Sequence, residues 1–325
     1  MKTIYNIFLA CAAITMLVAC NDELDSELYK QQVAFGKNGV NSVYVRYEPG
    51  GITSYDIPIV VGGTTFNSKE YHVKLALDKD TLDRLNFERF RNREDLWFEE
   101  LDSRFYKMPD EVVIPKGSAK GLLTIDFSLD GIDLVNNYIL PLTIVEDPSY
   151  EVNLRKHYRK SLLQVIPFND YSGTYSAVDV VISDRTGIQK EPITMDNRVV
   201  SVVDDKTVFF YAGTVEEEDR DRDKYKVMAE FQPSEGSPHE GLLKLSCPNA
   251  DEINFKANAG SFTIVKQMDA QLPYLEHEFI TMQVDYEYDH IKSGGIHLQY
   301  KCEGSMILER KRNLLIPDED QQIQW

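Results

Sequence analysis

The sequence predicts an all-β protein of two domains, a β-sandwich with a helical insertion followed by an antiparallel domain that is barrel-like or a second sandwich. The first observation is the strand pattern. From Val43 onward, short runs rich in Val, Ile, Tyr, Phe and Thr are separated by Gly, Pro, Asn and Asp. The second is the length of 325 residues, which is typical of two domains. An apolar content of 42% excludes a disordered chain.

The first half contains a series of short expected strands within about 130 residues, which fits a sandwich of immunoglobulin-like type. These strands are Val43–Tyr47, Tyr55–Val61, Tyr71–Leu77, Val112–Ile114, Leu122–Phe127, Tyr138–Val145 and Ser161–Ile166. A helical insertion is expected between Thr81 and Phe105, where apolar residues recur among charged ones, with Asp80 or Thr81 as its N-cap. We expect Trp97 and Phe98 to pack this insertion onto the sandwich.

The boundary between the domains is expected at residues 167–170, where a strand ends and turn-forming residues cluster. This predicts an N-terminal domain over 33–168 and a C-terminal domain over 169–325. The second series of strands has short turns, which suggests an up-and-down meander that closes and leaves few open edges. These strands are Thr174–Ile182, Arg198–Val203, Thr207–Tyr211, Tyr225–Phe231, Leu242–Ser246, Ile253–Asn258, Ser261–Val265, Phe279–Tyr288, Ile296–Cys302 and Met306–Lys311.

The N-terminus has the features of a lipoprotein signal. Lys2 precedes an apolar stretch from Ile4 to Val18, and Ala19-Cys20 closes it as a lipobox would. We therefore expect a signal peptide over 1–19, lipidation of Cys20, and a lipidated acidic tether over 20–32. An uncleaved anchor or a plain secretory signal is the alternative.

The charge balance and the cysteines limit the partners. A net charge of −18 argues against nucleic acid, because phosphate binding needs clustered Lys and Arg, so the partner is neutral or a patch of another protein. Once Cys11 leaves with the signal and Cys20 is acylated, Cys247 and Cys302 remain, either as a disulfide or as two buried thiols. Neither has the spacing of a metal site, and no cofactor is expected.

Several motifs resemble those of a known family. The stretches 55–59, 75–78, 108–109, 112–117 and 137–142 resemble the immunoglobulin-like N-terminal domain of Bacteroidetes lipoproteins, domain-of-unknown-function family 1735, over roughly Leu28 to Phe168. The remainder, opening with Asn169–Tyr175, is similar to family 4361. The acidic run Asn21–Glu27 resembles the signal that sends lipoproteins to the outer face of the outer membrane. The resemblance implies surface glycan binding beside an outer-membrane glycan importer and its glycosidases.

Two stretches match a known catalytic or metal-binding motif only in part. Asp130-Gly131-Ile132-Asp133 starts like the D-G-x-D-x-D-x-E motif of family 18 glycosidases, but Asn137 stands where the acid should be, so we interpret 130–137 as a loop. Asp219, Asp221 and Asp223 have the spacing of a calcium loop, yet Lys224 replaces the required Gly, and a solvated hairpin tip is the better interpretation.

Sugar recognition without catalysis needs an aromatic ring against the pyranose face and polar groups for its hydroxyls. The candidates near turns are Tyr274, Tyr286, Tyr288 and Trp325, although Tyr286 and Tyr288 share one face of a strand, which favours a place in the core for both. We therefore predict a non-catalytic, outer-membrane lipoprotein that binds glycan and faces the cell exterior. A structural or adhesive subunit that binds protein partners is the first alternative, and a glycoside hydrolase is the second.

Overall fold

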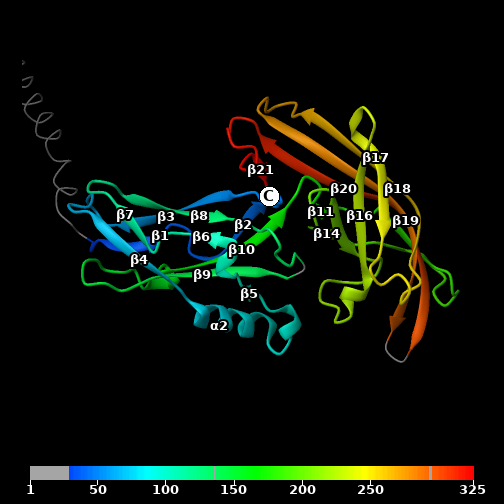
Figure 1. The fold of residues 1–325 in the computed structure, drawn as a ribbon, viewed down its shortest axis with the longest axis horizontal. Helices are drawn as coiled ribbons and strands as arrows, with labels where there is room; N and C mark the ends of the chain where they lie inside the picture. The colour runs from blue at the N-terminus through cyan, green and yellow to red at the C-terminus, as the bar shows by residue number, and fades with distance from the viewer. Residues whose placement is uncertain (1–28, 135, 293–294) are drawn as a thin grey trace, which may run out of the picture.

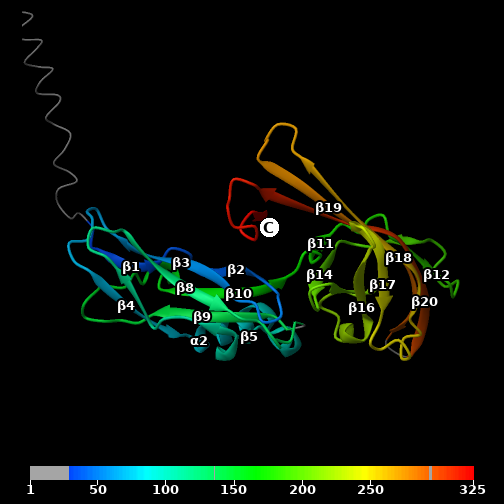
Figure 2. The same ribbon diagram turned by 45° about the horizontal axis from the view of Figure 1, so that its top comes forward.

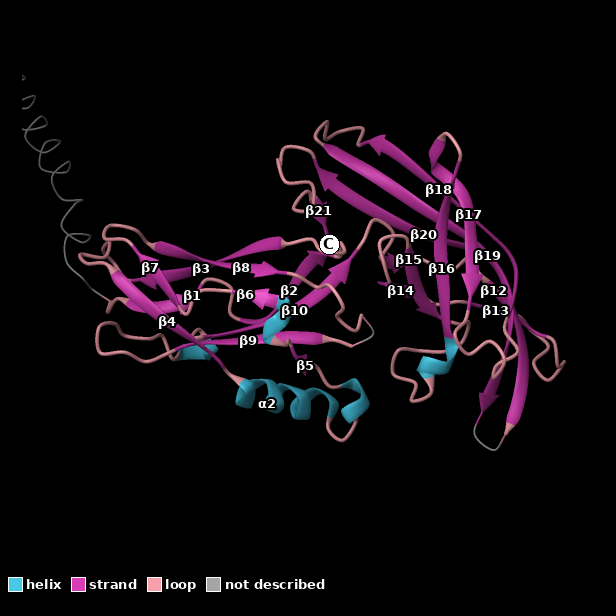
Figure 3. Ribbon diagram, in the orientation of Figure 1, coloured by secondary structure: helices cyan, strands magenta, loops and turns pink. Residues whose placement is uncertain are grey.

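The computed structural model describes residues 29–134, 136–292 and 295–325, which are built mainly of β-strands (Figure 3). The predicted signal peptide, Cys20 and most of the tether lie outside these residues. The chain forms two halves placed end to end: residues 32–168 make two sheets and residues 173–324 make one large curled sheet (Figure 1). The predicted fold class is confirmed. No helix in the described ranges is both long and apolar enough to cross a bilayer.

The N-terminal half is a sandwich whose core lies between two sheets with strand orders β1-β3-β8-β6 and β2-β10-β9-β4-β7. Strand β8 shows why it forms: Leu123, Ile125 and Phe127 are buried, and the residues between them point outward. The strands are β1 (Gln32–Phe35), β2 (Gly39–Arg46), β3 (Thr53–Gly62), β4 (Tyr71–Leu77), β5 (Glu99–Glu100), β6 (Tyr106–Lys107), β7 (Glu111–Ile114), β8 (Lys120–Phe127), β9 (Tyr138–Ile144) and β10 (Lys160–Phe168).

The helical insertion expected over Thr81–Phe105 is confirmed in its first part, as α2 (Lys79–Phe90), which lies on the outer face of β9 (Figure 1). The rest of the segment is not α-helical and includes strand β5. The predicted N-cap is wrong, because Asp78 caps the helix by accepting a hydrogen bond from the Thr81 backbone N–H at 3.2 Å. Phe98 packs with Leu82 in a small cluster over the sheet, as expected. Trp97 is not part of this cluster, and its indole N–H donates to the Arg91 carbonyl at 3.2 Å. Short 3₁₀ helices follow at η2 (Glu94–Leu96), η3 (Ser103–Phe105), η4 (Arg155–His157) and, in the second half, η5 (Arg222–Tyr225).

The C-terminal half is an antiparallel sheet with the order β11-β14-β15-β16-β17-β18-β19-β20-β12-β13, and β21 pairs with β20. The sheet curls around an aromatic core (Figure 2). The strands are β11 (Gly173–Tyr175), β12 (Val181–Asp184), β13 (Ile193–Thr194), β14 (Arg198–Val202), β15 (Thr207–Tyr211), β16 (Lys226–Ser234), β17 (Ser237–Ser246), β18 (Lys256–Met268), β19 (Leu275–Lys292), β20 (Ile296–Asn313) and β21 (Ile323–Gln324).

Three expected strand boundaries are wrong in this half. The strand predicted over Thr174–Ile182 is split into β11 and β12. The strands predicted over Ile253–Asn258 and Ser261–Val265 largely merge into β18, which absorbs a register shift between Ala257 and Ala259. The last two predicted strands are one continuous β20 through Gly304, where a side chain would collide with the Asp179 carbonyl.

The two cysteines of this half are free and buried, so the thiol alternative is the one that the structure shows. Burial raises the pKa of Cys302 to about 12, which leaves it an unreactive packing residue.

Candidate functional site: a groove between the two halves

Three adjoining cavities of about 410, 360 and 230 Å³ lie at the junction of the two halves. The first two are lined by both halves and share Ile166, Pro167, Val199 and Ser201. The second and third share Val199 and Tyr211. We call this continuous depression the interdomain groove. Ligand sites favour such domain junctions, and the two larger cavities fall in the usual range of about 300–1,000 Å³.

One end of the groove is aromatic. Trp325 follows β21 and crosses to the other half, where its ring stacks on Tyr44 at 4.0 Å and 4°. The edge of Phe168 meets the same indole at 4.8 Å, and the Arg310 guanidinium lies 5.6 Å from the ring centre. The C-terminus accordingly lies between the two halves in Figure 1. Trp325 remains 48% exposed, so it forms a ledge at the edge of the first cavity.

The second cavity has an apolar floor and a polar rim. The floor comes from both halves and includes Phe98, Val165 and Phe209. The rim carries amide, carboxylate and guanidinium groups, which belong to Arg89, Asn136, Asn137, Gln164, Glu217, Glu218 and Arg222. The accessible lining of this cavity is thus mixed, with polar groups in the larger share. Apolar rings combined with hydrogen-bonding groups suit the two faces of a sugar.

Several rim groups are available to a ligand. Within the described ranges, no hydrogen bond or ion pair involves the side chains of Asn137, Gln164, Glu217 or Glu218, although all four line the second cavity. Burial raises the pKa of the Glu217 carboxyl, and the neighbouring charges of Glu218 and Glu216 raise it further. Hydrogen bonds donated by the hydroxyl groups of a ligand would stabilise the charged form of this carboxylate.

Charged contacts at this end join the two halves. The Arg222 guanidinium donates to the Asp95 backbone carbonyl at 2.8 Å and lies 3.4 Å from its carboxylate. Arg93 holds the same carboxylate at 2.8 Å and donates to the Glu218 backbone carbonyl. We call Arg93, Asp95, Arg222 and Glu218 the clasp. Sequence reasoning missed it because segment 216–224 reads as a solvated tip, and nothing local indicates a partner far away in the chain.

The opposite end is held by two other arginines. Arg46 bonds Asp170 at 2.8 Å and Asp320 at 2.7 Å, and so links β2 to the linker and to the C-terminal segment. Arg310 is 3% exposed and donates to the backbone carbonyls of residues 169, 170 and 172 at 2.8–3.2 Å. We call these two arginines, together with Trp325, the strap.

Of the four sugar-binding candidates from the sequence, Trp325 lines the groove and the others do not. Tyr286 and Tyr288 are 0% and 1% exposed, and their hydroxyls accept hydrogen bonds from the backbone N–H groups of Gly213 and Thr214 at 3.0 Å. Rings enclosed in this way cannot stack on a sugar, so these two predictions are corrected in favour of core packing. Tyr274 is half-buried just before β19, outside the groove.

The two failed motifs lie in connections between strands. The described residues of 130–137 form the loop that leads into β9, as interpreted. The calcium-like stretch lies between β15 and β16 and includes η5. Within the described part of the chain, no group of three or more His, Cys, Asp or Glu side chains has the geometry to hold a metal ion.

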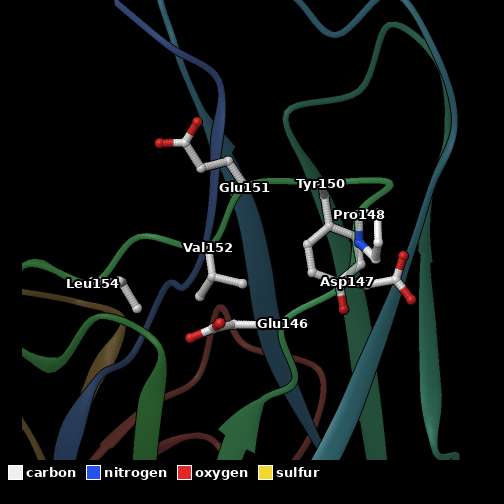
Figure 4. A pocket seen from close by; sticks show the side chains of 7 residues that line it. All are labelled: Glu146, Asp147, Pro148, Tyr150, Glu151, Val152 and Leu154. Carbon is white, nitrogen blue, oxygen red and sulfur yellow. The ribbon is translucent and has the colours of Figure 1, made fainter.

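A further cavity of about 400 Å³ lies at the other end of β9 and β10, next to Glu146, Asp147 and Glu151 (Figure 4). Its three carboxylates are already paired: Glu146 with Arg159 at 2.6 Å, Asp147 with Lys74 at 2.8 Å, and Glu151 with Lys30 at 3.3 Å. The interdomain groove offers more unpaired polar groups and is the better candidate.

Solved structures from Bacteroides match nearly the whole chain. A structural-genomics protein of unknown function from Bacteroides ovatus is 39% identical, with a TM-score of 0.79, over 91% of this chain and 100% of its own. The chain belongs to the same family. Other members are a multidomain protein including DUF1735 from Bacteroides ovatus (38% identity, TM-score 0.78, 91% and 100% coverage) and an auxiliary nutrient binding protein from Bacteroides thetaiotaomicron (35%, 0.79, 89% and 96%).

Domain models refine this family assignment. A domain of unknown function, DUF4973, matches residues 22–148, and a model described as a C-terminal domain matches residues 159–306. The N-terminal match is thus to DUF4973, whereas family 1735 enters through the description of a family member. The expected likeness to family 4361 stays a prediction. No curated protein matches the chain.

Proposed function

We propose that this protein is a non-catalytic glycan-binding lipoprotein of the cell surface, with the interdomain groove as its binding site. The observation that carries the proposal is the second cavity, where an apolar floor lies beneath amide and carboxylate groups that have no partner among the described residues. Such a site can accept a sugar ring and its hydroxyls. The family member described as an auxiliary nutrient binding protein supports a binding role.

The location at the surface rests on the sequence. The lipobox at Cys20 and the acidic tether over 20–32 support acylation and an outer-membrane anchor that faces the exterior, ahead of domains over 33–168 and 169–325. Several acyl chains anchor stably, because each buried methylene contributes about 0.8 kcal/mol. In this position the protein would hold glycan near an outer-membrane importer and its glycosidases. Palmitate labelling of the wild type and of Cys20→Ser tests the anchor, and an unlabelled wild type would contradict it.

The binding role is tested by affinity electrophoresis in gels that contain host N-glycans, mucin glycans or plant polysaccharides. We expect at least one of these to retard the protein, and Asn137→Ala with Gln164→Ala to abolish the retardation. Gln267→Ala is the matched control, because this exposed amide lies on β18 outside the groove cavities. Unchanged migration of the wild type in every gel would contradict glycan binding. Equal retardation of the groove variant and of Gln267→Ala would contradict the groove as the binding site.

The second candidate function is a structural or adhesive subunit. The ends of β18, β19 and β20 project beyond the rest of the sheet (Figure 2), and large apolar side chains are exposed there. Val265 is 55%, Met268 48%, Leu272 41%, Leu314 44% and Leu315 73% exposed. Co-purification of a neighbouring outer-membrane protein, together with no glycan retention, would favour this candidate.

A further inference from the structure

We infer that the interdomain groove takes a neutral, hydroxyl-rich oligosaccharide, and that Glu217 and Glu218 discriminate against glycans that carry carboxylate or sulfate groups. This inference rests on the proposed glycan-binding function and adds the class of ligand. Three features of the groove support it: the carboxylates of Glu217 and Glu218 form no ion pair with described residues, its arginines are mostly bound to protein groups, and its three cavities adjoin one another.

The acidic groups of Glu217 and Glu218 line the cavity, and none of the described residues forms an ion pair with them. Glu217 and Glu218 line both the second and the third cavity, and no ion pair reaches either carboxylate within the described ranges. A carboxylate accepts hydrogen bonds from sugar hydroxyls, and such charge-assisted bonds are stronger than neutral ones. An anionic sugar would instead bring a like charge into a partly desolvated site, which is unfavourable.

The basic groups around the groove are mostly engaged. Arg222 is bound to Asp95, and Arg310 donates to backbone carbonyls. Arg198, which lines the third cavity, donates to the Gly213 carbonyl and lies 3.4 Å from Glu216. Arg89 stands over the rings of Phe90 and Phe98, at 5.3 Å from each. The arginines that line the groove are thus held by protein groups, and the charges of Arg198 and Arg222 act on Glu217 itself. A free cluster of arginines, which recognises anions, is not found among the described lining residues.

The extent of the groove indicates more than one sugar. The three cavities share lining residues in sequence from Trp325 at one end to Glu216 at the other, and each of the two larger ones alone has the volume of a small-ligand site. A chain of several residues can therefore contact the Trp325 ledge and the Glu217–Glu218 rim at once.

The test compares neutral probes, yeast mannan and xyloglucan, with anionic probes, polygalacturonate and chondroitin sulfate, by affinity electrophoresis and calorimetry on the full mature protein. We expect binding to a neutral probe and none to the anionic ones. The double variant E217Q/E218Q should weaken neutral binding about tenfold, the equivalent of one charge-assisted hydrogen bond. It should also raise the affinity for the anionic probes.

The matched control is E146Q/E151Q, which removes the same net charge from the distal cavity of Figure 4 and should leave every affinity unchanged. Equal effects of the two double variants would overturn the assignment to Glu217 and Glu218. Preferential binding of wild type to an anionic probe would overturn the inference but leave glycan binding intact. Failure of wild type to bind either class would instead overturn the proposed function.

A pH titration of wild-type affinity gives an independent measurement. Hydroxyl donors favour the charged carboxylates, so neutral-probe affinity should be constant at neutral pH and should fall on acidification as Glu217 becomes protonated. Because the pKa of Glu217 is raised in the free protein, this loss should begin above the usual titration range of a glutamate. An affinity that does not change on acidification would overturn the role of these carboxylates.

Discussion

The strap and the clasp join the same two halves through arginine side chains, but the strap contains an arginine that is almost fully enclosed. In the strap, the Arg310 side chain is 2% exposed and is satisfied by backbone carbonyls of the linker. In the clasp, Arg93 and Arg222 also donate to backbone carbonyls, but their ion pairs with Asp95 are more exposed. The side chains of Arg93, Asp95 and Arg222 are 30%, 42% and 16% exposed. A buried guanidinium that satisfies several carbonyls is costly to remove, whereas an exposed ion pair contributes little because water and salt screen it.

This difference indicates how the groove can change shape. The linker at residues 169–172 is fixed by Arg310 and Arg46, and the C-terminal segment is tied to the same place by Asp320 and Trp325. The most buried arginine of the clasp, Arg222, is 16% exposed, against 2% for Arg310. We therefore expect the two halves to pivot at the strap and to separate at the clasp, where the Glu217–Glu218 rim lies.

The largest expected effect comes from Arg310→Ala. It removes the donors to three linker carbonyls and takes a counter-charge from the buried Glu278, so the free energy of unfolding of the C-terminal half should fall by about 3 kcal/mol. Denaturant unfolding measures this loss. Arg84→Ala, on the exposed face of α2, is the control and should be nearly neutral. If Arg310→Ala were as stable as Arg84→Ala, the enclosed arginine would contribute no more than an exposed one. The strap would then have no stronger anchor than the clasp.

Trp325→Ala should have the next largest effect. Its stacking on Tyr44 and its edge contact with Phe168 tie the C-terminus to the other half, and the loss of such ring pairs costs about 1 kcal/mol. Thermal unfolding measures it against Phe66→Ala, a control in which the ring is 75% exposed. Trp325→Tyr should recover part of the loss. If alanine at position 325 changed nothing, the C-terminal residue would not belong to the strap.

The sequence predicted the sheets better than the junction between them. Strand β15 matches its prediction over Thr207–Tyr211, because a short run of β-branched and aromatic residues that follows turn-forming aspartates is a local signal. The merger of the last two predicted strands into β20 could not be predicted, since Gly304 reads as a turn residue and the Asp179 backbone that it accommodates lies far away in sequence.

The site was also hard to predict, because it is formed by residues that lie far apart in the sequence. Trp325 is a candidate from the sequence as an aromatic residue at the end of the chain, and the structure places it in the groove. Tyr286 and Tyr288 carried the same aromatic signal, yet their strand faces the core. Gln164, Glu217 and Glu218 gave no signal of their own, because they converge only when β10 and the β15–β16 connection are brought together by the strap and the clasp.

Acid should weaken the strap before it affects the Arg310 contacts. Desolvation alone would raise the pKa of Asp170, but the hydrogen bond and charge of Arg46 outweigh it and hold that pKa below its ordinary value. The stabilisation is therefore fully present above about pH 4 and is lost as pH falls through the lowered pKa. Wild type should lose stability below about pH 4, and Asp170→Asn should lose less over the same range. If the stability of wild type and of Asp170→Asn fell equally with pH, protonation of Asp170 would not be what weakens the strap.

The smallest expected effect is on global stability in Arg222→Ala, where only the clasp changes. Its melting temperature should stay closest to that of wild type, because the partner carboxylate of Asp95 is 42% exposed and water screens the ion pair. Its local effect should be distinct: amide hydrogen exchange should rise in residues 91–97 and 212–225 and stay unchanged in 169–172. About 1 M salt should produce the same pattern in wild type, because screening at that concentration acts within about 3 Å. If exchange rose equally in 169–172, the two ends of the groove would open together, and the strap would not be the pivot.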